Sequence, residues 1–338
     1  MRWMAGDISV ATPSSRLFLG LIPWYGLLIV LGAALAVFLA DREASRLSFP
    51  KDTILDLALW ILPIGILGAR AYYVIFSWPD FRFRSPLSVL YIWEGGLAIY
   101  GGLLAGLLVV LVFSRRRKLS LPRLLDVLIP GVALAQAIGR WGNYFNQEAY
   151  GPRLDAASPF AFFPLAVLIQ DPAGDSWHVA TFFLESCWDF LIFLFLIVAR
   201  RRLFRRQGDG FLFYVLLYAS GRLVVENLRM DSLYLGPAIR VSQLLSFFAA
   251  LLVWGTLLSR RFASRSARKG LLPGHVLPVA AAGVPVLLFC LGIPVFPEQL
   301  PVQMGSLCLF SLILIVSAFI LYGPSRAEEV LYANHSAA

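Results

Sequence analysis

Apolar runs of about 20 residues recur along the chain, and short polar or basic segments separate them. A helix needs about 20 mainly apolar residues to cross the hydrocarbon core of a bilayer. Runs of this length lie at 21–40, 55–77, 95–113, 124–145, 181–199, 211–228, 241–259, 276–295 and 303–322. The pattern therefore predicts nine spanning helices, of which the eighth is weakened by its prolines.

The composition indicates a membrane protein rather than a soluble domain. Hydrophobic residues make up 59% of the 338 residues and charged residues 14%, whereas soluble domains have about 25% charged residues. The net charge of +9 could suggest nucleic-acid binding, but the basic residues follow the ends of the apolar runs. We expect an all-α, polytopic membrane helical bundle with the lipid bilayer as its surroundings and no nucleic-acid partner.

The loops between the runs alternate between rich and poor in basic residues, and this alternation predicts the topology. The loops after the first, third, fifth and seventh runs are the rich ones, and rich loops face the cytoplasm. The N-terminus is then outside, and an odd number of helices returns the C-terminus to the cytoplasm. The rich loops contain Arg42, Arg46 and Lys51, then Arg115–Lys118 and Arg123, then Arg200–Arg202, Arg205 and Arg206, then Arg260, Arg261, Arg265, Arg268 and Lys269.

Three arginines lie well inside apolar runs, where a charge costs at least about 2.5 kcal/mol. They are Arg70, Arg140 and Arg222, in the second, fourth and sixth runs. All three runs cross from inside to outside, so each arginine is expected in the outer half of the membrane. Residues near the outer starts of the first, third and fifth runs are expected at the same depth: Tyr25, Glu94, Tyr100, His178 and Glu185. Independent segments thus direct polar residues to one level, which predicts one site.

The spacing of these residues indicates an anion-binding site. Tyr218, Arg222 and Glu226 recur every four residues, so they share a helix face and the arginine can partly pair with the glutamate. Arg140 and Asn143 also share a face. Unpaired or half-paired guanidinium groups in a lipid-accessible cavity would suit a phospholipid headgroup, because their planar fork matches phosphate oxygens. A plainer alternative is that buried arginines only pair with carboxylates and lock the bundle.

Several other chemistries lack their motifs. The chain has no HExxH, GxSxG, GxxxxGK[ST] or DDxxD sequence. It has three histidines, and its three cysteines lack CxxC spacing, so neither a metal site nor a disulfide framework is expected. No cofactor is implied.

Five segments carry a resemblance to a known family, the prolipoprotein diacylglyceryl transferases, in their order and separations. They are "PWYG" (23–26), "ILGARAYYVIF" (66–76), "YIWEGGLAIYGGLLAG" (91–106), "GRWGNYFNQEAYG" (139–151) and "YASGRLVVENLR" (218–229). The chain resembles this family over roughly residues 20–260. The resemblance implies a bacterial cytoplasmic-membrane enzyme that performs the first step of lipoprotein maturation. Such an enzyme moves the diacylglyceryl group of phosphatidylglycerol to the lipobox cysteine that follows the signal peptide of a preprolipoprotein, forming a thioether and releasing glycerol phosphate.

The resemblance also implies roles for individual residues. Arg140 and Arg222 would surround the phosphate and stabilise charge on the departing glycerol phosphate. A thiol with a pKa of about 8.5 is a poor nucleophile, so a base is required. The candidates are Tyr100, which replaces a histidine found in many members, and Glu148. The substrate-binding candidates are Tyr25, Arg70, Asn143, Asn146, Gly151, Tyr218 and Glu226.

Two further departures from the family pattern affect the expected organisation: the run at 178–185 and the two helices added after the seven-helix core. The run "HVATFFLE" (178–185) lacks a proline and contains an extra residue, so His178 and Glu185 receive no role. We expect a seven-helix transferase core at 1–260, a basic cytoplasmic linker at 261–275, and an accessory two-helix hairpin with a tail at 276–338. The loop at 152–177 is expected to form a small extracellular head between the fourth and fifth helices.

Two other functions stay open on the residues alone. A transporter for an anionic solute could also place arginines at one depth, although the cluster lies off the midplane and no inverted repeat is evident. A non-catalytic lipid-binding membrane protein, a degenerate relative of the family, is favoured by the tyrosine at position 100.

Overall fold

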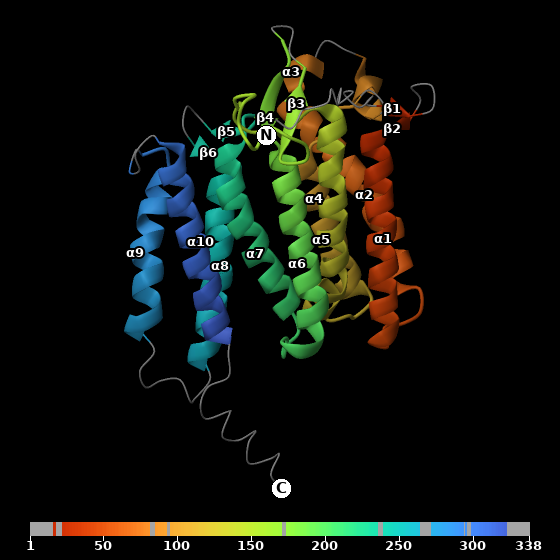
Figure 1. The fold of residues 1–338 in the computed structure, drawn as a ribbon. Helices are drawn as coiled ribbons and strands as arrows, with labels where there is room; N and C mark the ends of the chain where they lie inside the picture. Colours follow the sequence, from red (N-terminus) through yellow and green to blue (C-terminus); the bar gives the residue numbers. More distant parts are fainter. Residues whose placement is uncertain are drawn as a thin grey trace, which may run out of the picture. The chain divides into compact units, whose positions relative to one another are not determined.

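The fold is known from a computed structural model, which describes residues 16–17, 22–81, 85–92, 95–170, 174–235, 239–263, 272–293, 295 and 299–322. Most of these residues are helical, as the apolar runs predict (Figure 1). The long helices are α1 (Trp24–Arg46), α2 (Thr53–Phe76), α4 (Ile99–Arg116), α5 (Leu121–Asn146), α6 (Thr181–Arg202), α7 (Asp209–Val225), α8 (Val241–Ala263), α9 (Leu272–Cys290) and α10 (Leu300–Tyr322). The short elements are α3 (Trp78–Phe81), η1 (Pro86–Leu90), η3 (Glu226–Leu228), β1 (Arg16–Leu17), β2 (Ile22–Pro23), β3 (Ala166–Ile169), β4 (Ser176–Val179), β5 (Tyr234–Leu235) and β6 (Ile239–Arg240).

Most of the long helices have the length and composition of membrane spans. Among the described residues, eight qualify: α1, α2, α4, α5, α6, α7, α8 and α10. In α9, which has Pro278 and Pro285 in its interior, the apolar helical stretch is the shorter Leu277–Cys290. Large apolar side chains such as Leu59 and Leu252 are each 73% exposed, as expected of surfaces that face lipid. The prediction of an all-α polytopic membrane protein is confirmed, and a ninth crossing stays a prediction.

The chain divides into two compact units, and each is described by itself. The first unit comprises Met1–Gly32, Ala133–Leu196 and Leu212–Ala338. The second comprises Ala33–Val132 and Ile197–Phe211. The predicted boundaries at 260 and 275 are a different division that stays a prediction, and residues 264–271 of the expected linker lie outside the described residues.

In the second unit, α2 and α4 pack against each other through glycines. A Cβ atom added to Gly68 would lie 2.8 Å from the carbonyl oxygen of Gly101, and one added to Gly101 would lie 2.9 Å from the carbonyl carbon of Gly68. Real Cβ atoms do not approach other atoms so closely, so glycine at these positions permits the two backbones to meet.

We expect Gly101→Ala to destabilise the protein by about 1–3 kcal/mol, because the added methyl group forces α2 and α4 apart. Gly106→Ala is the matched control, because a Cβ there meets no atom within 4 Å. Thermal unfolding in detergent checks the prediction, and equal midpoints for the two variants would contradict it.

Carboxylates of the second unit determine where α7 begins. Asp126 of α5 accepts hydrogen bonds from the backbone N–H groups of Gly208, at 2.5 Å, and Phe211, at 3.0 Å. Asp209, the first residue of α7, accepts one from the N–H of Arg206 at 2.7 Å. The bonds to Asp126 satisfy N–H groups at the start of α7, which a helix leaves without intrahelical partners, and the bond to Asp209 holds the chain just before it.

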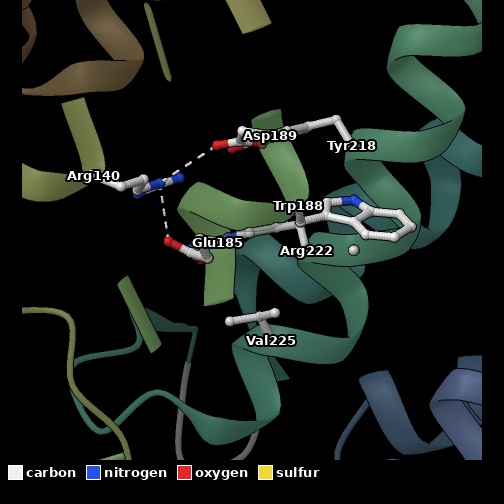
Figure 2. Close-up of a pocket in the computed structure, with 8 residues that line it drawn as sticks. Arg140, Glu185, Trp188, Asp189, Tyr218, Arg222 and Val225 are labelled. Carbon is white, nitrogen blue, oxygen red and sulfur yellow. Dashed lines mark hydrogen bonds and ion pairs between the residues drawn. The ribbon is translucent and has the colours of Figure 1, made fainter. Parts of the chain in front are cut away.

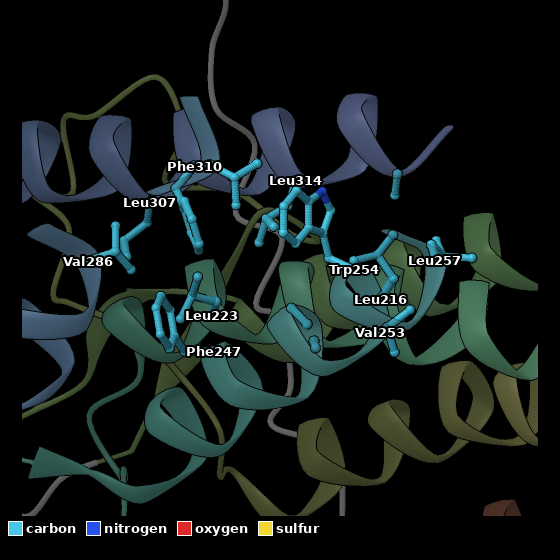
Figure 3. Packing of buried hydrophobic residues seen from close by; sticks show 14 of the residues in the cluster. Leu216, Leu223, Phe247, Val253, Trp254, Leu257, Val286, Leu307, Phe310 and Leu314 are labelled. Carbon is cyan, nitrogen blue, oxygen red and sulfur yellow. The ribbon is translucent and has the colours of Figure 1, made fainter. Parts of the chain in front are cut away.

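In the first unit, α7, α8, α9 and α10 share one hydrophobic core (Figure 3). Phe247 of α8 stacks on Phe310 of α10, with ring centroids 5.5 Å apart. Trp254 of α8 donates a buried hydrogen bond to the hydroxyl of Ser317 in α10, at 2.8 Å. The two C-terminal helices therefore pack closely against α7 and α8.

The chain between α5 and α6 forms a small antiparallel hairpin, β3 paired with β4. Val167 and Ile169 of β3 pack with Ala149, Ala180 and Phe182 in a separate small core. This compact structure lies where the sequence predicts a head, and its extracellular position stays a prediction.

Candidate active site

A small pocket of the first unit is built by α6 and α7 with one side chain from α5 (Figure 2). Arg140 comes from α5, Glu185 and Asp189 from successive turns of α6, and Arg222 from α7. The residues that line it are Arg140, Glu185, Trp188, Asp189, Tyr218, Gly221, Arg222 and Val225.

Small residues and backbone hydrogen bonds bring α6 close to its neighbours. A Cβ atom on Gly221 of α7 would overlap the indole ring of Trp188, at 2.9 Å from Cε2. The same indole donates a hydrogen bond to the carbonyl of Leu217 at 2.9 Å, and Ser186 donates one to the carbonyl of Ala137 in α5 at 2.8 Å. These contacts place the carboxylates of α6 between the arginines of α5 and α7.

Glu185 is the centre of the charged cluster. Its Oε2 lies 3.0 Å from Nε of Arg140 and 3.6 Å from Nη1 of Arg229, and its Oε1 accepts a hydrogen bond from Nη1 of Arg222. The Glu185 side chain is only 6% exposed. One buried carboxylate therefore holds three guanidinium groups together.

The predicted pair between Arg222 and Glu226 is present. Nη2 of Arg222 lies 2.6 Å from Oε2 of Glu226, whose side chain is fully buried. The helix changes to the 3-10 form at Glu226, and Arg229 follows this turn. Nη2 of Arg229 lies 2.7 Å from Oδ2 of Asp231. Burial raises the pKa of Asp231, but the ion pair with Arg229 outweighs it and holds this pKa below its ordinary value.

The arginines are more fully paired than the sequence suggests. The interpretation of unpaired or half-paired guanidinium groups is wrong for Arg222, which contacts both Glu185 and Glu226. The reason is that an uncompensated buried charge is too costly. Arg140 differs, because its pairs with Glu185 and Asp189 (3.9 Å) both use Nε.

The motif at 139–151 ends α5 in a tight turn. The side-chain amides of Asn143 and Asn146 donate to the same oxygen, Oε1 of Glu148, at 2.9 and 3.2 Å. Glu148 is exposed, and its neighbours Gln147 and Ala149 have positive φ angles of 52° and 55°. The structure therefore brings Asn143, Asn146 and Glu148 together, as the spacing of the motif suggests.

Gly151 joins this turn to the head. Its N–H donates to the carbonyl of Val179 at 2.8 Å, and its carbonyl contacts Nδ1 of His178 at 2.8 Å. A Cβ on Gly151 would lie 3.0 Å from Thr181 and 3.1 Å from the carbonyl oxygen of Leu228. His178 thus has a structural contact, and Gly151 permits three segments to meet.

The two tyrosine candidates of this unit flank the arginines differently. Tyr218 lines the pocket and stacks on Tyr214, with ring centroids 5.8 Å apart. Tyr25, at the start of α1, lies against Gly142 of α5, where a Cβ atom would be 3.0 Å from Cε2 of the tyrosine ring. Glycine in the motif therefore permits Tyr25 to approach the helix that carries Arg140.

Comparison with known proteins decides the family. Residues 17–259 match the family described as prolipoprotein diacylglyceryl transferase. The chain belongs to this family. Three similar relatives are all named phosphatidylglycerol–prolipoprotein diacylglyceryl transferase. The protein of Enterococcus faecalis is 44% identical, and the match covers 70% of this chain and 87% of the relative. The protein of Shouchella clausii is 42% identical, with 72% of this chain and 90% of the relative covered. The protein of Limosilactobacillus reuteri is 45% identical, with 69% of this chain and 85% of the relative covered.

Two of the predicted site residues of this transferase lie in the second unit. Arg70 is buried and donates to the backbone carbonyls of Val89 and Ser88, both at 2.8 Å, and of Gly95, at 2.7 Å. These bonds hold the segment before α4, so the contacts of Arg70 are structural, and a substrate-binding role stays a prediction. Tyr100 lies in the first turn of α4, with its ring centroid 6.4 Å from that of Tyr72.

The sequence analysis assigned no role to three charged residues of the cluster around Glu185. Glu185 was expected at the depth of the site but received no role, and Asp189 and Arg229 were not singled out. A signal was available for two of them, because Glu185 and Asp189 lie four residues apart in an apolar run and so share a helix face. Their common face is the one that meets Arg140.

Proposed function

We propose that this protein transfers the diacylglyceryl group of phosphatidylglycerol to the lipobox cysteine of preprolipoproteins. The observation that carries the proposal is the pair of guanidinium groups of Arg140 and Arg222, joined by Glu185 at a pocket of the unit that contains the 139–151 motif. Family membership supports the same activity. The protein is a multi-pass membrane protein of the bacterial type, so both substrates would reach the pocket through the bilayer.

The arginines would act on the leaving group. The phosphodiester of the lipid would bind the terminal nitrogens of Arg140. It would also contact the guanidinium of Arg222, which pairs with Glu185 and Glu226. The substrate thiolate would attack the glycerol carbon that bears the phosphate ester. As the S–C bond forms and the C–O bond breaks, the electron pair passes to glycerol phosphate, and the arginines stabilise its growing charge. Cys187, Cys290 and Cys308 take no part in this scheme, since the substrate supplies the sulfur.

The thiol proton would pass to one of two candidates. Glu148 is an exposed carboxylate, held by Asn143 and Asn146 in the unit that contains the arginines. Tyr100 occupies the position of the family histidine. Measuring the pH dependence of the rate for Glu148→Gln and Tyr100→Phe separates them. Loss of the base removes, in one variant only, the acidic limb of the profile, where the rate rises as the base loses its proton.

The orientation in the membrane belongs to the proposal as well. We place the N-terminus outside, the C-terminus in the cytoplasm and the site in the outer half of the bilayer, which the distribution of basic loops supports. The segment between α5 and α6 would then lie outside, where a secreted preprolipoprotein presents its signal peptide. The proposed organisation is a core at 1–260, a linker at 261–275 and a hairpin with a tail at 276–338.

The test uses purified protein in phosphatidylglycerol nanodiscs with a lipobox peptide. We expect a peptide with a thioether-linked diacylglyceryl group and an equal amount of glycerol phosphate. A peptide with serine in place of the lipobox cysteine is the control and is expected to give neither product. An active relative is assayed under the same conditions. If this protein binds phosphatidylglycerol but forms no product while the relative does, the transferase proposal is contradicted and a lipid-binding protein is favoured. Uptake of an anionic solute by proteoliposomes would favour a transporter.

A further inference from the structure

Helix α7 has two functional faces. Tyr218, Gly221, Arg222 and Val225 line the pocket on one face. On the opposite face, Leu216, Ala219 and Leu223 belong to the hydrophobic core that α7 shares with α8, α9 and α10. The position of Arg222 relative to Glu185 therefore depends on what packs behind α7.

Helix α10 contacts this rear face directly (Figure 3). Leu307, Phe310 and Leu314 of α10 are buried in the same core as Leu223. Ser311 of α10 donates a buried hydrogen bond to the carbonyl of Ser220, at 3.2 Å. Ser220 lies two residues before Arg222, so this contact fixes the turn of α7 that carries the arginine.

A second polar contact joins α10 to the end of α7. The amide of Asn227 donates to Oε1 of Gln303 at 3.4 Å and accepts a hydrogen bond from Nη1 of Arg240 at 2.6 Å. Asn227 follows Glu226 in the 3-10 turn. Gln243 of α8 donates a buried hydrogen bond to the carbonyl of Leu223, in the last turn of α7, at 3.0 Å. The turn that places Glu226 beside Arg222 is thus held from behind.

The contacts of Ser311 and Gln303 come from a part of the chain outside the family match, which ends at residue 259. We propose that α10 is a positioning element of the transfer site, in which Ser311 and Gln303 hold α7 so that Arg222 and Glu226 keep their geometry. This inference rests on the proposed transferase function. The mechanism is indirect: neither residue lines the pocket, and a shift of about 1 Å in a catalytic group can lower a rate about 100-fold.

The test compares two double variants of the full-length protein. Ser311→Ala with Gln303→Leu removes both polar contacts to α7. The matched control, Ser306→Ala with Gln299→Leu, makes the same two changes. Ser306 donates to the carbonyl of Val302 in its own helix, at 2.9 Å, and Gln299 is exposed just before the helix. We expect the first variant to lose about tenfold in kcat with KM for phosphatidylglycerol within about twofold, because the misplaced arginine mainly loses transition-state contacts.

Two further variants identify the cause of any loss in kcat. Gln303→Glu with Ser311 intact keeps both contacts, including an acceptor for Asn227, and is expected to retain the wild-type kcat. Equal kcat for the two double variants, or an equal fall in kcat and folded fraction, would overturn the positioning role. Arg222→Ala is run in parallel. If Arg222→Ala is inactive while the α10 variant matches its control, only the positioning role fails. If Arg222→Ala is fully active, the site in the proposed function fails as well.

Discussion

Replacing Arg140 by alanine is expected to lower kcat for diacylglyceryl transfer by about 10²–10³-fold, because a preorganised positive charge beside the leaving phosphate is lost. Arg140 lines the pocket, and its Nε is held by Glu185 and Asp189. Steady-state release of glycerol phosphate in nanodiscs measures the loss. In a transferase-depleted strain the variant is expected not to restore growth.

The geometry of the guanidinium group, and not charge alone, is expected to matter. Arg140→Lys should recover only part of the rate, since an ammonium cannot contact Glu185 and a phosphate with two fixed edges. Arg117→Ala is the matched control: Arg117 pairs with Asp56 at 2.5 Å, at an exposed position of the second unit. Full complementation by Arg140→Ala would remove this arginine from the site.

Glu185→Ala is expected to have the largest effect on stability. It would leave Arg140, Arg222 and Arg229 without their shared carboxylate in a buried cluster. Breaking a buried ion pair by removing one partner costs about 3–5 kcal/mol. We therefore expect a marked fall in the unfolding midpoint in detergent, together with loss of transfer activity.

Asp231→Ala is the matched control for this prediction. Asp231 also pairs with Arg229, but its side chain is 45% exposed, and such pairs contribute about 0–1 kcal/mol. Glu185→Gln keeps the volume and an acceptor oxygen, so its effect is expected to lie between the two. If Glu185→Ala and Asp231→Ala have the same unfolding midpoint, Glu185 does not hold the arginines together.

Most of the helices and part of the site follow from local patterns. The apolar runs coincide with long helices because a span must bury or present apolar side chains along its whole length. The spacing of Arg222 and Glu226 predicts their ion pair because residues four apart are neighbours on a helix. The cluster of Asn143, Asn146 and Glu148 is also local, since the three lie within one turn.

The remaining parts of the site depend on contacts between distant segments. No local pattern shows that Glu185 joins three arginines, since this requires α6 to approach α7 through Gly221. The same holds for Arg70, whose charge in an apolar run suggested a ligand site, but whose donors meet backbone carbonyls of the segment before α4.

The sequence by itself determined that this protein is a polytopic helical membrane protein of a transferase family, because span length, charge distribution and a short motif are properties of consecutive residues. Only the tertiary structure decided that Glu185 joins Arg140, Arg222 and Arg229 and that α10 lies behind α7. Pairing of buried charges depends on which helices come within a few ångströms of each other, and that is set by the packing of side chains far apart in the chain.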